Sequence, residues 1–192
     1  MEEFSNEDRN SSRQHQKNSP KLIRIDNREE WHIRGKLHRT DGPARIWPSG
    51  QQEWFIDNKL HRTDGPAIIR ADGSQEWRIH GKRHRTDGPS IIRADGMQEW
   101  HINNRLHRAD GPARIWANGR EEWWFEGNRH RADGPAITSA EGHLLWFYND
   151  VRHRLDGPAA EFIDGTQEWW VNGYQVDRLT IMLLQQEIKK VL

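Results

Sequence analysis

The chain has 192 residues, of which 33% are hydrophobic, and its mean hydropathy is −1.08. This composition is too polar for one deep globular core but suits a thin, elongated repeat body. The 29 basic and 29 acidic residues cancel, which argues against a non-specific nucleic-acid binder and against attraction to an anionic membrane. The chain has no cysteine and no apolar run of the roughly 20 residues that a membrane span needs. We therefore expect a cytoplasmic protein.

The first 27 residues contain no tryptophan and no glycine, and Ser, Asn, Gln and charged side chains dominate them. They hold too few apolar side chains to offset the entropy lost on ordering. The opening residues are acidic and polar, unlike a secretory signal. We predict that residues 1–27 form a disordered tail.

From residue 28 to residue 173 the sequence repeats with a step of 23 residues, which gives about six and a half repeats. Tryptophan keeps this step from Trp31 to Trp169, and a turn glycine keeps it from Gly50 to Gly165. A step without insertions over so many fixed positions is the signature of a solenoid or linear array. Each repeat also carries a His-Arg-x-Asp-Gly-Pro block. Its histidines and aspartates are His38 and Asp41, His61 and Asp64, His84 and Asp87, His107 and Asp110, His130 and Asp133, and His153 and Asp156.

Two strands and two turns fill each repeat. An apolar or aromatic residue stands two places after each tryptophan, as Ile56 does after Trp54, and this alternation is typical of a strand. A second strand follows each proline. Asp72-Gly73 and its equivalents predict two-residue hairpin turns, and the second turn, as at Asp57-Asn58, requires a left-handed residue at its second position. The sequence predicts an all-β, single-layer repeat of antiparallel hairpins that advances by roughly 10 Å per repeat.

The sequences Gly81-Lys82-Arg83-His84, Asp95-Gly96 and Asn172-Gly173 resemble the punctuation of the MORN repeat, a β-hairpin unit with the same period. The His-Gly-x-Gly segment of MORN repeats is replaced here by His-Arg-x-Asp-Gly-Pro-Ala. This variant is similar to arrays in phage and large-DNA-virus proteins. The resemblance covers roughly residues 28–173 and implies an elongated hairpin array. It also implies protein–protein scaffolding, dimerisation or phospholipid binding, and the host cytoplasm if the protein is viral.

A single His-Arg-x-Asp block could be taken for an acid–base cluster or a metal site, but six equal blocks favour a structural role. Equivalent histidines would lie roughly 10 Å apart, too far to share a zinc ion whose ligands lie at about 2.3 Å. We expect each aspartate to accept hydrogen bonds within the turn or to pair with the arginine two residues before it. We expect each histidine to donate to a carbonyl of the neighbouring repeat. The sequence accordingly predicts no catalytic residue, no metal and no cofactor.

The seven tryptophans in register are expected in the core. Other aromatic residues fall by parity on the opposite face, together with several arginines such as Arg45 and Arg114. Clustered Trp, Phe and Arg side chains are typical of protein interfaces. The candidate interaction surface comprises Trp47, Phe55, Arg70, Arg93, Trp116, Trp124, Phe147 and Trp170.

The period changes after residue 173. Asp177 can cap a helix, and apolar residues from Leu179 to Ile188 follow at helical spacing. Residues 174–192 are predicted to form a helix, for which two roles stay open. The favoured role is a cap on the open edge of the last hairpin, and the other is docking of a partner or a second chain. Because Glu161 replaces an isoleucine, we also expect the end of the array to be rearranged.

The leading functional hypothesis is a non-catalytic scaffold that binds a protein of unknown identity, with a homodimer through the terminal helix or a sheet edge as a further option. The first alternative is a viral or phage counter-defence protein that sequesters a small anionic ligand or inhibits a host protein. The second alternative is binding to anionic phospholipid, which the neutral net charge disfavours. No nucleic-acid partner is expected.

Overall fold

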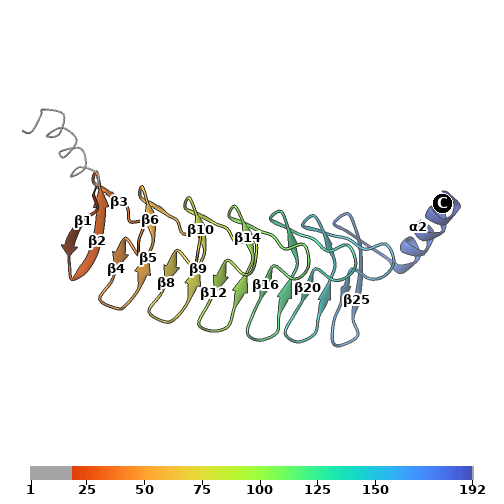
Figure 1. The fold of residues 1–192 in the computed structure, drawn as a ribbon. Coiled ribbons are helices and arrows are strands. Elements are labelled where there is room, and N and C mark those ends of the chain that lie inside the picture. Colours follow the sequence, from red (N-terminus) through yellow and green to blue (C-terminus); the bar gives the residue numbers. More distant parts are fainter. Residues whose placement is uncertain (1–18, 192) are drawn as a thin grey trace, which may run out of the picture. The chain divides into compact units, whose positions relative to one another are not determined.

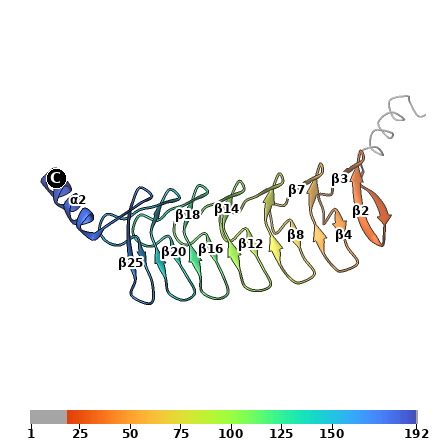
Figure 2. The same cartoon turned by 180° about the vertical axis from the view of Figure 1, so that it is seen from behind.

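The computed structural model describes residues 19–191. They divide into two compact parts, an N-terminal part that ends at His84 and a C-terminal part that begins at Arg85. Within each part, successive hairpins of an open antiparallel sheet lie side by side in chain order, as Figures 1 and 2 show from two sides. The predicted all-β repeat of antiparallel hairpins is confirmed.

The main sheet of the N-terminal part has the order β1-β2-β4-β5-β8-β9. Its strands are β1 (Lys21–Ile25), β2 (Arg28–Ile33), β4 (Arg45–Ile46), β5 (Gln52–Glu53), β8 (Ile68–Ile69) and β9 (Gln75–Glu76). Each repeat adds a second, shorter hairpin. These hairpins use the end of β2 with β3 (Lys36–Leu37), β6 (Phe55–Ile56) with β7 (Lys59–Leu60), and β10 (Arg78–Ile79) with β11 (Lys82–Arg83).

The C-terminal part repeats this plan. Its main sheet contains β12 (Ile91–Ile92), β13 (Gln98–Glu99), β16 (Arg114–Ile115), β17 (Glu121–Glu122), β20 (Ile137–Thr138), β21 (Leu144–Leu145), β24 (Ala160–Glu161), β25 (Gln167–Val171) and β26 (Tyr174–Val176) in that order. The second hairpins are β14 (His101–Ile102) with β15 (Arg105–Leu106), β18 (Trp124–Phe125) with β19 (Asn128–Arg129), and β22 (Phe147–Tyr148) with β23 (Val151–Arg152).

Each repeat tryptophan stands where the chain leaves the main sheet for the second hairpin. Trp54 lies between β5 and β6, and its N–H donates to the Ala67 carbonyl oxygen at 2.8 Å. Its own carbonyl oxygen accepts from the N–H of His61 at 2.9 Å. The tryptophan backbone therefore connects the two hairpins, and it fixes where the His-Arg-x-Asp-Gly-Pro block begins.

The two kinds of turn differ in backbone conformation. Asp57 and Asn58 have φ of 49° and 63°, and positive φ at both central residues is the type I′ geometry that suits a two-residue hairpin. In the other turn only the glycine is left-handed, as at Gly73 with φ 85°. The Arg70 carbonyl oxygen accepts from the Gly73 N–H at 3.0 Å, and the Arg70 N–H donates to the Ser74 carbonyl oxygen at 2.8 Å. The prediction of a two-residue turn is wrong here, because this pattern is a three-residue loop with a glycine bulge.

Strand β1 lies within the segment that was predicted to be a disordered tail. It pairs with β2 over its whole length, through a turn at Asp26-Asn27 in which both residues have positive φ. The tail prediction is therefore wrong for residues 21–27, because Asp26-Asn27 forms the same turn as Asp57-Asn58 although no repeat tryptophan precedes it. Ser19 and Pro20 lie outside any strand, and residues 1–18 of the predicted tail lie outside the described residues.

The last repeat keeps the common hairpin. Glu161 in β24 lies opposite Gln167 in β25, so the predicted rearrangement of the array end is wrong. The carboxylate at this unusual position is accommodated because Glu161 Oε1 pairs with Arg154 Nη1 at 3.0 Å.

Helix α2 spans Arg178–Val191. The Asp177 side chain accepts a hydrogen bond from the Thr180 N–H at 2.7 Å, which confirms the predicted N-cap. The first three residues of the segment predicted to be helical instead form β26. No helix within residues 19–191 has the length and apolar character that a membrane span requires.

Candidate interaction surfaces

The arginine of the repeated block makes the same two hydrogen bonds in every repeat. Its Nε donates to Oδ1 of the aspartate two residues later at 2.8 to 2.9 Å. Its Nη1 donates to the proline carbonyl oxygen, at 3.3 Å between Arg62 and Pro66. For Arg39, Arg62, Arg108, Arg131 and Arg154, the Cζ also lies over the ring of the preceding tryptophan, 4.0 to 4.3 Å from the centroid. The predicted Asp–Arg pairing is confirmed.

The glycine of the block is required by the same arginine. A Cβ at Gly111 would lie 2.7 Å from Arg108 Cζ, and the equivalent distances in the other five repeats are 2.7 to 3.0 Å. The guanidinium group therefore occupies a slot between an indole ring and a glycine backbone. Only a residue without a side chain allows this close approach.

The histidine of the block contacts the next repeat, but the hydrogen bond runs in the opposite direction to the one predicted. The Nδ1 atom of His61 accepts from the N–H of His80 at 3.1 Å, so the histidine is an acceptor from the backbone and not a donor to a carbonyl. The same contact joins His38, His107, His130 and His153 to their following repeats. The neighbouring Arg62 N–H donates to the Arg78 carbonyl oxygen at 3.1 Å. We call this pair of contacts the repeat clasp.

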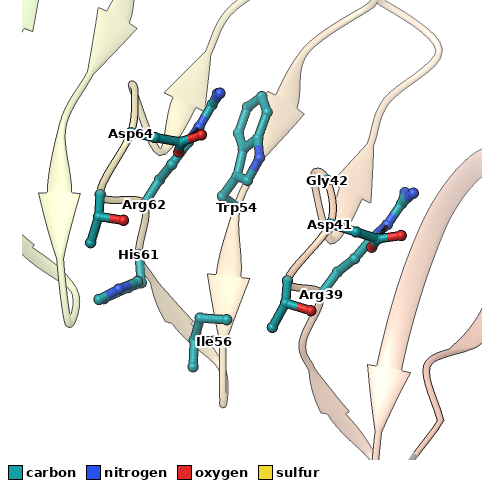
Figure 3. Close-up of a pocket in the computed structure, with 10 residues that line it drawn as sticks. Arg39, Asp41, Gly42, Trp54, Ile56, His61, Arg62 and Asp64 are labelled. Carbon is teal, nitrogen blue, oxygen red and sulfur yellow. Dashed lines mark hydrogen bonds and ion pairs between the residues drawn. The ribbon is translucent and has the colours of Figure 1, made fainter.

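Adjacent blocks enclose a groove. Its two walls are the Arg39–Gly42 and His61–Asp64 turns, and its floor includes Trp54 and Ile56. Figure 3 shows the indole of Trp54 standing between the two turns. This groove has a volume of about 820 Å³. Two grooves of the C-terminal part, over Trp100 and over Trp146, have volumes of about 500 and 510 Å³.

In each block the acidic group of the Asp–Arg pair points toward solvent and the basic group points inward. The block aspartates are 76 to 85% exposed, whereas their partner arginines are only 20 to 26% exposed because each guanidinium lies against tryptophan. Pairing with arginine also lowers the pKa of these carboxyl groups, for example Asp110 beside Arg108, so they stay ionised. Each ion pair therefore presents its negative end to solvent at the groove rim.

The predicted Trp, Phe and Arg surface is brought together in two clusters. In the N-terminal part, Arg45 lies over both Trp47 and Phe55, with Cζ 5.6 and 5.3 Å from the ring centroids. The same guanidinium pairs with the carboxylates of Glu30 and Glu53 at 2.8 and 3.1 Å. These aromatic rings are half-buried, and the arginine charge between them is already neutralised.

In the C-terminal part the aromatic and arginine side chains alternate. Arg114 lies over Trp116 and Trp124, and Arg152 lies over Phe147 and Trp170. Phe147 is buried against Ala136 and Ile137, and Trp170 is half-buried. Of the two remaining predicted residues, Arg70 pairs with Glu76 at 3.2 Å, and Arg93 is exposed.

Sequence reasoning missed a row of glutamates on this face. A glutamate precedes the repeat tryptophan in all repeats except the one with Leu145. Glu76 is only 2% exposed and accepts from Arg70, Arg78 and Arg83. Burial alone would raise the pKa of Glu76, but these arginines lower it overall. The regular spacing of the glutamates was the available signal.

A second row missed by sequence reasoning is exposed. The rings of His107, Phe125, His130, Tyr148 and His153 follow one another with centroid separations of 4.8, 6.2, 4.5 and 6.2 Å. Phe125 is 43% exposed and Tyr148 is 53% exposed. We call these five side chains the ring row. It borders the groove over Trp146, which Tyr148 and His153 also line.

Helix α2 contacts the last repeats through few side chains. Ile181 is buried, and Gln185 Nε2 donates to the Leu155 carbonyl oxygen at 2.6 Å. Leu179, Met182, Leu183, Leu184 and Ile188 remain exposed. The choice between a capping helix and a docking helix stays a prediction.

Within residues 19–191, no group of three or more His, Asp and Glu side chains is arranged so that it could hold a metal ion. No protein-family model matches the chain, and no curated protein matches it significantly.

Replacing Gly111 with Ala tests the arginine slot. The added Cβ displaces the Arg108 guanidinium from Trp100, and we expect a loss of about 1 kcal/mol in the free energy of unfolding. The measurement is urea unfolding followed by tryptophan fluorescence. In an Arg108→Ala background the same substitution should cost much less, because no guanidinium is left to displace. An equal cost in both backgrounds would show that the slot does not explain the glycine.

Replacing His61 with Asn tests the repeat clasp. Burial, together with the nearby His80, lowers the pKa of His61 below its usual 6.5. The unfolded chain therefore binds this proton first, so the free energy of unfolding should fall as pH drops below 6.5. The Asn side chain keeps an acceptor oxygen but does not titrate. Urea unfolding at pH 7.5 and pH 5.5 should therefore show a smaller pH effect in the variant than in the wild type, and equal slopes would refute the assignment.

Replacing Glu30 with Gln tests the buried glutamate row. Burial raises the pKa of Glu30, but His32, Arg28 and Arg45 together lower it to about 2. Its contribution to stability is therefore present above pH 4.5 and is lost as pH falls toward 2. Glu30→Gln should be less stable than wild type at pH 7 and should lose less stability between pH 4.5 and 2. The control Glu29→Gln, at a more exposed neighbour, should follow the wild-type profile.

Proposed function

We propose that the chain is a non-catalytic scaffold that binds a protein partner through the grooves between successive His-Arg-x-Asp-Gly-Pro blocks. The observation that carries this proposal is the recurrence of one groove geometry along the repeats. Each groove combines an aromatic and aliphatic floor with a charged rim, which is the mixture typical of protein interfaces.

The rigidity of the walls supports binding. The arginine slot and the repeat clasp fix both walls of a groove before any ligand arrives, so little further ordering is needed on binding. Equivalent grooves on one array also allow several weak contacts to act together. A partner with a periodic or extended binding segment would gain most from this arrangement.

The orientation of the groove charges bears on the alternatives. A small anionic ligand or an anionic phospholipid headgroup needs accessible cationic groups, yet the groove arginines lie inward and the aspartates lie outward. Acid–base catalysis needs histidine and carboxylate groups that are free to exchange protons, yet His107 Nδ1 and Asp110 Oδ1 are engaged in the clasp and the slot. These contacts favour the protein-binding scaffold over the alternatives.

A photo-crosslinking residue placed at Ala132 tests the proposal in native cells. Ala132 is exposed and lines the groove over Trp146, and Ala117 is an equally small, exposed residue on a hairpin loop that serves as the matched control position. We expect a discrete protein crosslinked from Ala132 and not from Ala117, identified by mass spectrometry. Crosslinking should fall when Asp110, Asp133 and Asp156 are all replaced by Asn.

The control for that variant replaces Asp72, Asp95 and Asp164 with Asn. These aspartates lie in the loops at the other turn, where each Oδ1 accepts an N–H two residues later, a bond that Asn retains. Both variants remove the same charge, so only position differs. Equal crosslinking from Ala132 and Ala117, or no crosslinked protein at all, would contradict groove-based binding.

A further inference from the structure

The grooves of the C-terminal part recur with a defined spacing. Each repeat contributes two neighbouring strands to the main sheet, as β16 and β17 or β20 and β21 do. Adjacent strands in a sheet lie about 4.8 Å apart, so the blocks that form the groove walls recur roughly every 10 Å. A ligand that contacts several grooves in the same way must present equivalent groups at that spacing.

The exposed charge at these grooves is negative and repeats with them. Asp110, Asp133 and Asp156 are 81 to 85% exposed, and each uses Oδ1 to bind its inward-facing arginine. The second carboxylate oxygen of an exposed pair remains available for a cation from solvent. Charge complementarity therefore calls for a ligand with one cationic side chain per groove.

Between the carboxylates the surface is aromatic. The ring row runs along the same repeats, and the groove over Trp146 adds Tyr148 and Leu155. Exposed rings in a row are suited to packing against proline rings and aliphatic side-chain stems, as in the aromatic-lined grooves that accept polyproline II segments.

We propose that the C-terminal part binds an extended segment in the polyproline II conformation that carries Arg or Lys at every third position. A polyproline II helix has three residues per turn and rises by about 3.1 Å per residue, so every third side chain lies on one face about 9.3 Å from the last. This distance matches the roughly 10 Å spacing of the grooves. In a β-strand, every third side chain would alternate between faces. The inference rests on the proposed function and names the partner's chemistry.

Fluorescence anisotropy with labelled peptides tests the spacing. The probe is (Arg-Pro-Pro)4, and the matched peptide (Arg-Pro-Pro-Pro)4 carries the same charge at a different spacing. We expect the first to bind the full-length protein about tenfold more tightly, because exposed ion pairs contribute only a few-fold each and act together only in register. (Glu-Pro-Pro)4 should not bind. Equal affinity for the two arginine peptides would overturn the spacing, leaving general electrostatic attraction only.

The protein variants test the site. The combined Asp110, Asp133 and Asp156→Asn variant should bind (Arg-Pro-Pro)4 about tenfold more weakly, because three exposed ion pairs are lost. The Asp72, Asp95 and Asp164→Asn variant should bind it like wild type. Both variants are first checked for wild-type melting temperature and circular dichroism. If melting falls, Tyr148→Ser, which removes a ring and no groove charge, serves instead and should also weaken binding. Equal weakening by the groove and loop variants would overturn the assignment.

The outcomes for the two proposals are distinguishable. If no arginine peptide binds, yet Ala132 still crosslinks a protein in a way that depends on the groove aspartates, the polyproline II inference is wrong and the scaffold proposal stands. If (Arg-Pro-Pro)4 fails to bind and Ala132 crosslinks nothing, both are wrong. Peptide binding that depends on spacing and on the groove aspartates supports the inference.

Discussion

The arginine of each His-Arg-x-Asp-Gly-Pro block occupies a slot, and most fixed positions of the repeat follow from that contact. The guanidinium needs an indole ring on one side, a residue without Cβ on the other, and a carboxylate and a carbonyl oxygen at its edges. Trp, Gly, Asp and Pro supply these in every block. The preceding histidine then accepts from the next repeat. The contacts within one block therefore also fix the position of the next repeat. Order in a linear array passes from repeat to repeat in this way.

The other face of the sheet explains how so polar a chain can form it. Buried glutamates take the place of a broad apolar core, and they are compensated by nearby arginines, as Glu99 is by Arg114 of the adjacent strand at 2.7 Å. Losing one partner of such a pair would leave a buried charge, which is costly. In one repeat both charged residues of a cross-strand pair are replaced by apolar ones. Ile137 lies opposite Leu145 there, whereas the preceding repeat has Arg114 opposite Glu122. In other repeats an apolar residue lies opposite a glutamate, as Ile68 does opposite Glu76 and Ile91 does opposite Glu99, so the two members need not change together.

The sequence predicted features that depend on local backbone chemistry or on strict periodicity. The left-handed second residue of the Asp57-Asn58 type of turn, the Asp–Arg pairs and the N-cap at Asp177 belong to this class, because few residue types satisfy their geometry. Asp72-Gly73 was misassigned because Asp-Gly suits a glycine bulge as well as a two-residue turn. Strand β1 was missed because no repeat tryptophan or glycine marks its segment, although its turn, Asp26-Asn27, has the same residue pair as Asp57-Asn58. The glutamate row was missed because parity assigns a residue to a face but does not reveal whether another side chain covers that face.

The division between fixed and variable positions explains how one block can serve both structure and binding. The inward atoms, Arg Nε, Asp Oδ1 and His Nδ1, make the contacts of the slot and the clasp, and the same three residue types occur in all six blocks. The outward positions do vary: the residue after the arginine is Thr63 in one groove and Leu155 in another. The residue two places after the tryptophan changes from Ile56 to Tyr148. Repeats of identical backbone therefore present different groove surfaces, and partner selectivity would lie in these substitutions, since the conserved inner contacts are the same for every groove.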